Sequence, residues 1–204
     1  MTFAFRLPVR AATSLCAAAA LLFLAACTPE GPKFQSSDIS GSAFGRDFAL
    51  TDHNGKARTL ADYRGKAVVM FFGYTQCPDF CPTTMSELAE AMKALGPDAD
   101  RVQVLFVTVD PERDTKEILA QYVPAFDPRF VGLYGDAAAT ERTAKEFKVI
   151  YQKQPGAVSG TYSVDHSAGA YIFDPKGRLR LYVSYGQGHD VFAHDLRELL
   201  RTTS

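Results

Sequence analysis

Two cysteines near the middle of the chain have a spacing that could do chemistry. Cys77 and Cys81 are separated by Pro-Asp-Phe. Residues four apart on a helix share a face, with Cβ atoms about 5–6 Å apart, so the pair could form a disulfide when oxidised or hold one soft metal ion. A helix N-terminus would favour the thiolate, which is both the nucleophile and the metal ligand. The pair therefore supports redox exchange or metal binding. A purely stabilising disulfide is the weaker alternative, because it would close a very small loop.

The surrounding pattern predicts where the pair lies. Continuous apolar runs predict buried strands, and apolar residues at helical spacing predict helices. A cysteine pair that follows a central strand and enters a helix matches a thioredoxin-like arrangement. We therefore expect an α/β fold with three layers (α/β/α) and an N-terminal β-hairpin extension within residues 44–204. The expected strands are 67–73, 102–109, 130–134, 171–173 and 179–184, the helices follow Cys81, Asp114, Asp136 and Asp190, and a hairpin turn lies at 52–55.

A metal ion held by two cysteines needs a third ligand, and the chain has four histidines. His53 lies in the hairpin turn and is expected to be solvated. His189 lies beside the start of the last helix and His194 lies within it, so ordinary structural roles are expected for both. His166 precedes the strand before the final hairpin, in a loop that faces the cysteine-bearing helix of a thioredoxin-like fold. His166 is therefore the candidate third ligand.

These three donors favour copper. Two thiolates suit Cu(I), and an imidazole permits Cu(II) as well, although zinc could use the same ligands plus water. Thioredoxin-like oxidoreductases place a cis-proline in the loop opposite their cysteines. Here no proline occurs between Pro155 and Pro175, and His166 occupies that region. This difference favours a metal ligand over a reductase site.

The N-terminus predicts export. Residues 1–26 contain arginines, no acidic residue and a short Ala-rich apolar run, as in a signal peptide. The run ends in Leu-Ala-Ala-Cys27, which resembles a bacterial lipobox and implies cleavage before Cys27 and a lipid on its sulfur. An uncleaved N-terminal anchor is the alternative. Residues 27–43 would form a lipidated N-terminus and flexible linker. We expect a bacterial membrane lipoprotein with its domain in the periplasm.

Composition excludes some classes of protein. Lys and Arg number 22 and Asp and Glu 23, giving a net charge of −1, so the chain lacks the basic excess typical of nucleic-acid binding. The acidic run 110–114 is interpreted as a turn in which Asp114 and Glu117 form a helix-capping box, with a partner-docking surface as the alternative.

Three segments resemble the Sco/SenC/PrrC family of copper-binding thioredoxin-fold proteins, which assist assembly of cytochrome c oxidase. The resemblance spans roughly residues 44–200 and implies that Cys77, Cys81 and His166 ligate copper. The segments are Phe71-Phe-Gly-Tyr-Thr75 with Cys77-Pro-Asp-Phe-Cys81-Pro-Thr83, then Val107-Thr-Val-Asp-Pro-Glu-Arg-Asp114, then Val164-Asp-His-Ser167 with Tyr171-Ile-Phe-Asp-Pro175.

The resemblance implies a copper metallochaperone, a carrier and not an enzyme, that delivers Cu(I) or Cu(II) to the dinuclear copper site of cytochrome c oxidase subunit II. Other partners would be a second periplasmic copper chaperone or a thiol reductase. Two alternatives remain open. The Cys77–Cys81 redox pair could serve a thiol-disulfide oxidoreductase that keeps the acceptor cysteines reduced, or the protein could be a copper or redox sensor.

Overall fold

The computed structural model describes residue 2 and residues 31–203. The chain divides into two compact units, Met1–Pro32 and Lys33–Ser204, and the helices and strands of the described residues all lie in the second. Apart from residue 2, the predicted signal peptide lies outside the described residues, as does Cys27. Within the described part, no helix has the length and apolar character needed to cross a membrane.

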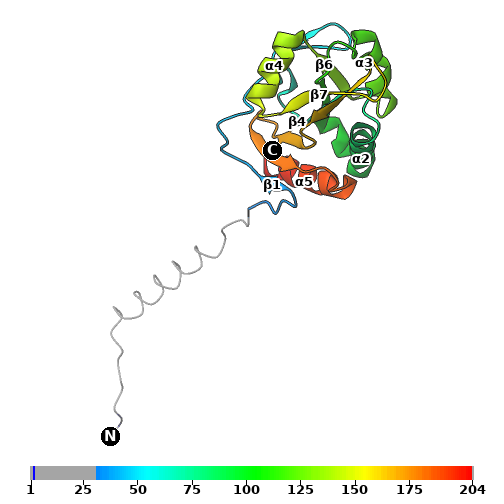
Figure 1. The fold of residues 1–204 in the computed structure, drawn as a ribbon. Helices are drawn as coiled ribbons and strands as arrows, with labels where there is room; N and C mark the ends of the chain where they lie inside the picture. The colour runs from blue at the N-terminus through cyan, green and yellow to red at the C-terminus, as the bar shows by residue number, and fades with distance from the viewer. Residues whose placement is uncertain (1, 3–30, 204) are drawn as a thin grey trace. The chain divides into compact units, whose positions relative to one another are not determined.

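A mixed sheet forms the centre of the domain (Figure 1). Strand β4 runs parallel to β5 and antiparallel to β9, and β2 and β3 form the predicted N-terminal hairpin at one edge. Across residues 31–203 this sheet has eight strands, in the order β1 (Ser37–Asp38), β10 (Leu179–Val183), β9 (Ala170–Phe173), β4 (Ala67–Gly73), β5 (Val102–Thr108), β6 (Val131–Tyr134), β2 (Leu50–Asp52) and β3 (Ala57–Arg58).

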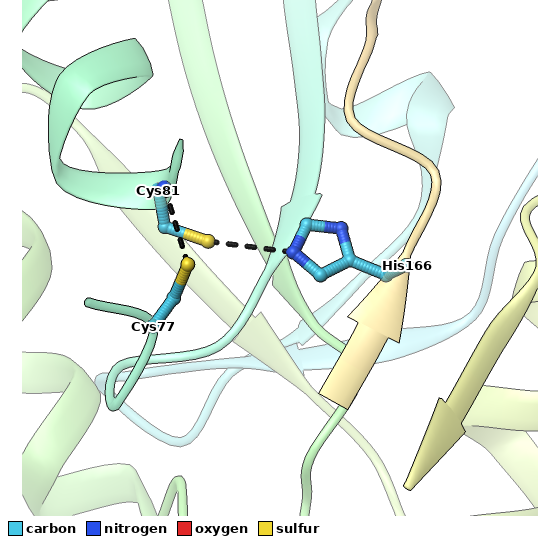
Figure 2. Close-up of side chains that lie close together, drawn as sticks. All are labelled: Cys77, Cys81 and His166. Atoms are coloured by element: carbon cyan, nitrogen blue, oxygen red, sulfur yellow. Dashed lines mark hydrogen bonds between the residues drawn. The ribbon is translucent and has the colours of Figure 1, made fainter. Parts of the chain in front are cut away.

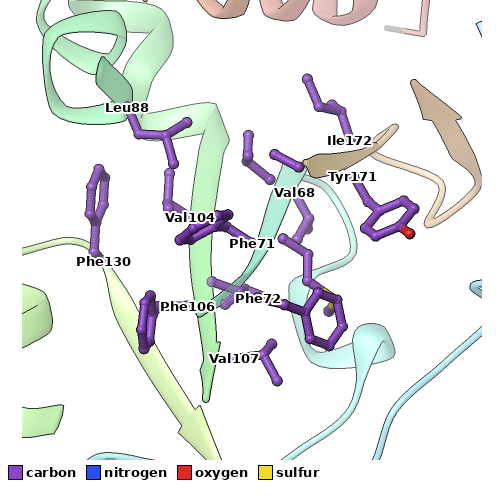
Figure 3. Packing of buried hydrophobic residues seen from close by; sticks show 14 of the residues in the cluster. Val68, Phe71, Phe72, Leu88, Val104, Phe106, Val107, Phe130, Tyr171 and Ile172 are labelled. Atoms are coloured by element: carbon purple, nitrogen blue, oxygen red, sulfur yellow. The ribbon is translucent and has the colours of Figure 1, made fainter. Parts of the chain in front are cut away.

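Helices cover both faces of the central strands, which explains why every residue of β4 is buried. Successive side chains of β4 point to opposite faces, so Phe71 packs against Phe106 on one face (Figure 3). On the opposite face, Phe72 packs against Phe147, which follows α4. Helix α2 lies on the Phe71 side of the sheet, where it packs against α5. The helices are α2 (Phe80–Leu95), α3 (Lys116–Tyr122), α4 (Ala137–Glu146) and α5 (His189–Thr202), with 3-10 turns at Leu60–Tyr63, Gly96–Arg101 and Val123–Ala125. The predicted three-layer thioredoxin-like fold is confirmed.

The linker was expected to extend through residue 43, but the folded domain begins about ten residues before that point. The compact unit begins at Lys33, and β1 adds an edge strand beside β10. Asp195 of α5 accepts hydrogen bonds from the backbone amides of Gln35 (2.8 Å) and Ser36 (2.9 Å) and from the Ser36 hydroxyl (2.5 Å). A two-residue strand in a serine-rich segment shows no apolar alternation, so its sequence resembles that of a linker.

A hairpin absent from the sequence-based prediction carries His166. Strands β7 (Tyr151–Pro155) and β8 (Tyr162–His166) pair antiparallel in a small sheet of their own. The sequence pattern placed His166 in a loop, but His166 is the last residue of strand β8. The hairpin escaped prediction because β7 reads Tyr-Gln-Lys-Gln-Pro, is largely exposed, and therefore lacks an apolar face.

Two predicted local roles were wrong. Thr115 caps α3, and Asp114 is instead buried, where it accepts hydrogen bonds from the hydroxyls of Thr75 and Thr108, each at 2.6 Å. His53 is buried and not solvated, and its Nδ1 accepts a hydrogen bond from the Gly132 amide at 3.1 Å. In both cases a polar side chain satisfies the backbone or side chain of a remote segment, which local sequence does not reveal.

Candidate metal centre

Two cysteines and one histidine converge at the end of β4 (Figure 2). The donor atoms of Cys77, Cys81 and His166 all lie within 4.8 Å of one another. Cys81 Sγ is 3.5 Å from His166 Nε2. Of the residues singled out from sequence, these three come together, whereas His53, His189 and His194 are not part of the group.

The two cysteines occupy different local structures. Cys77 precedes α2, while Cys81 lies in its first turn. Cys77 Sγ accepts a hydrogen bond from the Cys81 backbone amide at 3.5 Å. The sulfur therefore satisfies one of the unpaired amides at the helix N-terminus. The expectation that both cysteines share one helical face is thus corrected: only the second is helical.

The thiols also differ in exposure. Cys81 is fully buried, and Cys77 is 7% exposed. Burial, with a further contribution from the neighbouring Cys77 sulfur, raises the pKa of the Cys81 thiol. A buried thiolate is unfavourable without a compensating cation, so deprotonation of Cys81 should accompany the binding of a metal ion. Both cysteines are free in this structure.

His166 is held in the tautomer that a metal ligand needs. Its Nδ1 lies 3.0 Å from the backbone oxygen of Ser167. Because a carbonyl oxygen only accepts, Nδ1 must carry the proton, and the lone pair on Nε2 faces Cys81. Burial lowers the pKa of His166, which also favours the neutral ring. The imidazole ring makes a T-shaped contact with the Tyr74 ring, at a centroid separation of 5.9 Å.

Gly73 is a site residue that sequence reasoning missed. A Cβ atom at this position would lie 2.8 Å from Cys81 Sγ and 2.9 Å from Phe106. Glycine at the end of an otherwise apolar strand can mark a close approach, and this was the available signal. The absence of a side chain at Gly73 therefore makes room for the Cys81 sulfur.

A pocket of about 310 Å³ opens beside the donor group. Cys77 and His166 line it, together with Tyr74, Phe80 and Asp165 among others, whereas Cys81 does not. A molecule in this pocket would thus meet Cys77 and His166 first. Two sulfurs and one imidazole nitrogen at these separations could hold copper, and they could also hold zinc with an added ligand.

The fold and the donor group define a thioredoxin-like domain with a thiolate–imidazole metal centre. Residues 36–201 match the family described as SCO1/SenC. The chain belongs to the SCO1/SenC family, as the sequence motifs had indicated.

Known relatives agree with this membership. The mitochondrial SCO2 homolog of Bos taurus is 39% identical over 153 residues, which cover 74% of this chain and 58% of that protein. The chain thus matches less than two thirds of that relative. Among solved structures, Bradyrhizobium japonicum ScoI with copper bound matches with 41% sequence identity and a TM-score of 0.71. The match covers 78% of this chain and 100% of that one. BsSco, described as a member of the Sco family of cytochrome c oxidase assembly proteins, is 21% identical with a TM-score of 0.63; the match covers 83% of this chain and 98% of that one and shows the fold alone.

Proposed function

We propose that this protein is a copper metallochaperone that acts in the assembly of cytochrome c oxidase. Its cargo is one copper ion, held by Cys77, Cys81 and His166, and its acceptor is the dinuclear copper site of oxidase subunit II. The observation that carries the proposal is the convergence of three donor atoms within 4.8 Å. Copper bound to ScoI, which is 41% identical, supports the choice of metal.

The unequal environments of the donors suggest an order of transfer. Cys77 lines the open pocket, whereas Cys81 is fully buried. An acceptor thiolate entering the pocket would replace Cys77 first, while Cys81 still holds the ion. Cys81 would be released last. Each exchange breaks one copper–sulfur bond as another forms, so the oxidation state of copper does not change.

A second candidate function is thiol-disulfide exchange. It is favoured by the two free sulfurs, which lie close enough to form a disulfide after a small movement. Such a reductase would need Cys77 and Cys81 but would have no use for His166. This difference allows one substitution to separate the two functions.

Copper loading of residues 33–204 tests the proposed site. The reduced domain should bind one copper ion per monomer, and preoxidised protein should bind none, because a disulfide removes both thiolates. His166→Ala should weaken Cu(II) binding more than Cu(I) binding, since two thiolates alone can hold Cu(I). His189→Ala, which removes an exposed imidazole outside the group, is the matched control. Tight copper binding by the preoxidised domain, or an unchanged Cu(II) spectrum in His166→Ala, would refute the assignment.

We further propose that a lipid on Cys27 tethers the domain to the membrane, with the domain in the periplasm. The support is the Leu-Ala-Ala-Cys27 sequence after an apolar run. The start of the compact unit at Lys33 leaves a short segment between this cysteine and the domain.

A further inference from the structure

The Arg113 guanidinium lies between three separate segments of the domain. Its Nε donates to Asp110 Oδ2 at 2.5 Å. Its Nη1 donates both to the backbone oxygen of Tyr162 at 2.9 Å and to Gln76 Oε1 at 3.1 Å. One side chain thus joins the loop after β5, the first residue of β8 and the residue next to Cys77.

Aromatic rings and a second hydrogen bond close this network. The guanidinium carbon lies 3.6 Å from the centroid of the Tyr162 ring and 5.6 Å from that of Tyr74. The Tyr162 hydroxyl donates to Asp110 Oδ1 at 2.8 Å, so Asp110 binds the arginine and the tyrosine at once. Asp110 is fully buried. The planar, multi-donor guanidinium suits such a stacked and forked arrangement, which a lysine cannot reproduce.

The network bears on the metal centre through β8. Tyr162 and His166 are the first and last residues of this strand, and the β7–β8 hairpin stands outside the main sheet. Strands β7 and β8 pair with each other, but neither pairs with a strand of the main sheet, so that sheet's ladder of hydrogen bonds does not hold the hairpin in place. Arg113 supplies a direct link between the hairpin and the loop that carries Cys77. Tyr74 adds a second link, because its ring contacts both Arg113 and His166.

We propose that Arg113 is a positioning residue for the metal centre: it holds β8 against the cysteine loop and so keeps His166 Nε2 facing Cys81 Sγ. This inference rests on the proposed function, because it assigns to Arg113 a role in building the same site. Loss of Arg113 should disturb the imidazole ligand more than the two thiolates, because the cysteine loop keeps the hydrogen bonds from Thr75 to Asp114 when the bond to Gln76 is lost. The effect should therefore fall on Cu(II), which requires nitrogen ligation more strongly than Cu(I) does.

The test compares Arg113→Gln and Arg113→Lys with the control Lys153→Gln in residues 33–204. Lys153 also lies over the Tyr162 ring, at 4.6 Å, and pairs with Glu112, but it does not bond to the cysteine loop. Both Arg113 variants should weaken Cu(II) binding by about 10–100-fold, as is typical when support for a metal-ligating side chain is lost. They should also shift the thiolate-to-Cu(II) absorption and leave Cu(I) affinity nearly unchanged. Lys153→Gln should match the wild type.

A double-mutant cycle separates positioning from a general loss of structure. If Arg113 acts through His166, Arg113→Gln should cause no further loss of Cu(II) affinity in a His166→Ala background. Additive losses in the cycle, or a wild-type Cu(II) spectrum in folded Arg113→Gln protein, would overturn the proposal. Should Arg113→Gln not fold, Tyr162→Phe removes only the hydroxyl bond to Asp110 and should shift the spectrum in the same direction; an unchanged spectrum there would likewise count against the proposal.

A measurement on copper-free protein keeps this inference distinct from the proposed function. The nuclear Overhauser contact between the Tyr74 and His166 rings should weaken in Arg113→Gln and persist in Lys153→Gln. If that contact weakens but His166→Ala leaves Cu(II) binding unchanged, the copper assignment fails while the positioning role stands. If the contact persists in Arg113→Gln, the positioning role fails.

Discussion

Cys77 Sγ accepts a hydrogen bond from the backbone amide of Cys81, so the first cysteine caps the helix that carries the second. This relationship makes the two sulfurs unequal. Cys77 lines an open pocket and lies in the field of the helix N-terminus, while Cys81 is fully buried and does not line that pocket. A carrier benefits from such an arrangement, since one ligand can be released while the other still retains the ion.

Gly73→Ala should disrupt the metal centre without changing any donor atom. The new Cβ would lie 2.8 Å from Cys81 Sγ, so the sulfur or the helix must move. Overpacking of this kind costs about 1–3 kcal/mol of stability, which a urea titration of copper-free protein would measure. We expect weaker binding of both Cu(I) and Cu(II), because Cys81 serves both oxidation states.

Gly132→Ala is the matched control for that change. Its Cβ would meet Val123, His53 and Leu119 at 3.1–3.3 Å, which is crowded but does not involve the donor group. It should lower stability and leave the copper affinities unchanged. Equal copper affinities in Gly73→Ala and the wild type would show that Gly73 is not needed to accommodate the sulfur.

Asp195 should make the stability of the domain depend on acidic pH. Burial by itself raises the pKa of this carboxyl, but hydrogen bonds from Gln35, Ser36 and His194 outweigh burial, and the net pKa is lowered. A lowered pKa means that the unfolded chain binds the proton more readily than the folded domain. The stabilisation is therefore complete above the unfolded value of about 3.9 and is lost as the pH falls through the folded value.

Asp195→Asn should remove this pH dependence and destabilise the domain near neutral pH. The amide places a donor where the backbone amides of Gln35 and Ser36 need acceptors, at a cost of about 1–3 kcal/mol. Denaturation curves between pH 3 and pH 7 would check both effects. Asp190→Asn, an exposed change on the same helix, is the control. A slope in Asp195→Asn that equals the wild-type slope would assign the pH dependence to other groups.

The sequence predicted the centre of the fold well and its periphery less well. The strand at Ala67–Gly73 has the predicted bounds, because burial on both faces produces an uninterrupted apolar run. The β7 strand was missed for the opposite reason, since it is exposed and polar. Asp114 was misassigned because it occurs three residues before Glu117, a spacing typical of a capping box, although its partners Thr75 and Thr108 lie elsewhere.

The three donor residues could be predicted from the sequence, but the residues that make room for them and hold them in place could not. Spacing and motif resemblance identified Cys77, Cys81 and His166, and the structure brings these three together. Their roles as copper ligands remain a prediction. Gly73 and Arg113 could not be found in the same way, because their importance depends on contacts between segments distant in sequence. A glycine at the end of an apolar strand signals a close approach, but only the structure shows that the approaching atom is the Cys81 sulfur. Arg113 has no local pattern that reveals its contacts.

Cys27→Ser should abolish lipid modification and release the protein from the membrane. The compact unit begins at Lys33, so the substitution lies outside it and should not unfold the domain. Metabolic labelling with a fatty-acid analogue, followed by membrane fractionation, would measure both effects. Cys16→Ser, a change within the predicted signal peptide, is the control and should leave labelling intact. Labelling that persists in Cys27→Ser would remove the lipoprotein assignment.

The last prediction separates the copper carrier from the thiol reductase in cells. In a strain that lacks this protein, we expect oxidase activity to fall and excess copper to restore it in part. A carrier raises the supply of metal to a site that can also load slowly from the medium, so added copper bypasses it. A reductase would be bypassed by added thiol reductant instead.

His166→Ala makes that experiment decisive, because it removes the imidazole and keeps the Cys77 and Cys81 thiols. The variant should fail to support oxidase assembly at limiting copper if the protein carries the metal, whereas a reductase would tolerate the change. His189→Ala, an exposed histidine outside the donor group, should complement fully and shows that loss of an imidazole alone is harmless. Oxidase activity at limiting copper and immunoblots of the variants would be measured together, so that lower protein abundance is not mistaken for lost function. Full oxidase assembly with His166→Ala at limiting copper would reject the metallochaperone mechanism and leave thiol-disulfide exchange as the function of the cysteine pair.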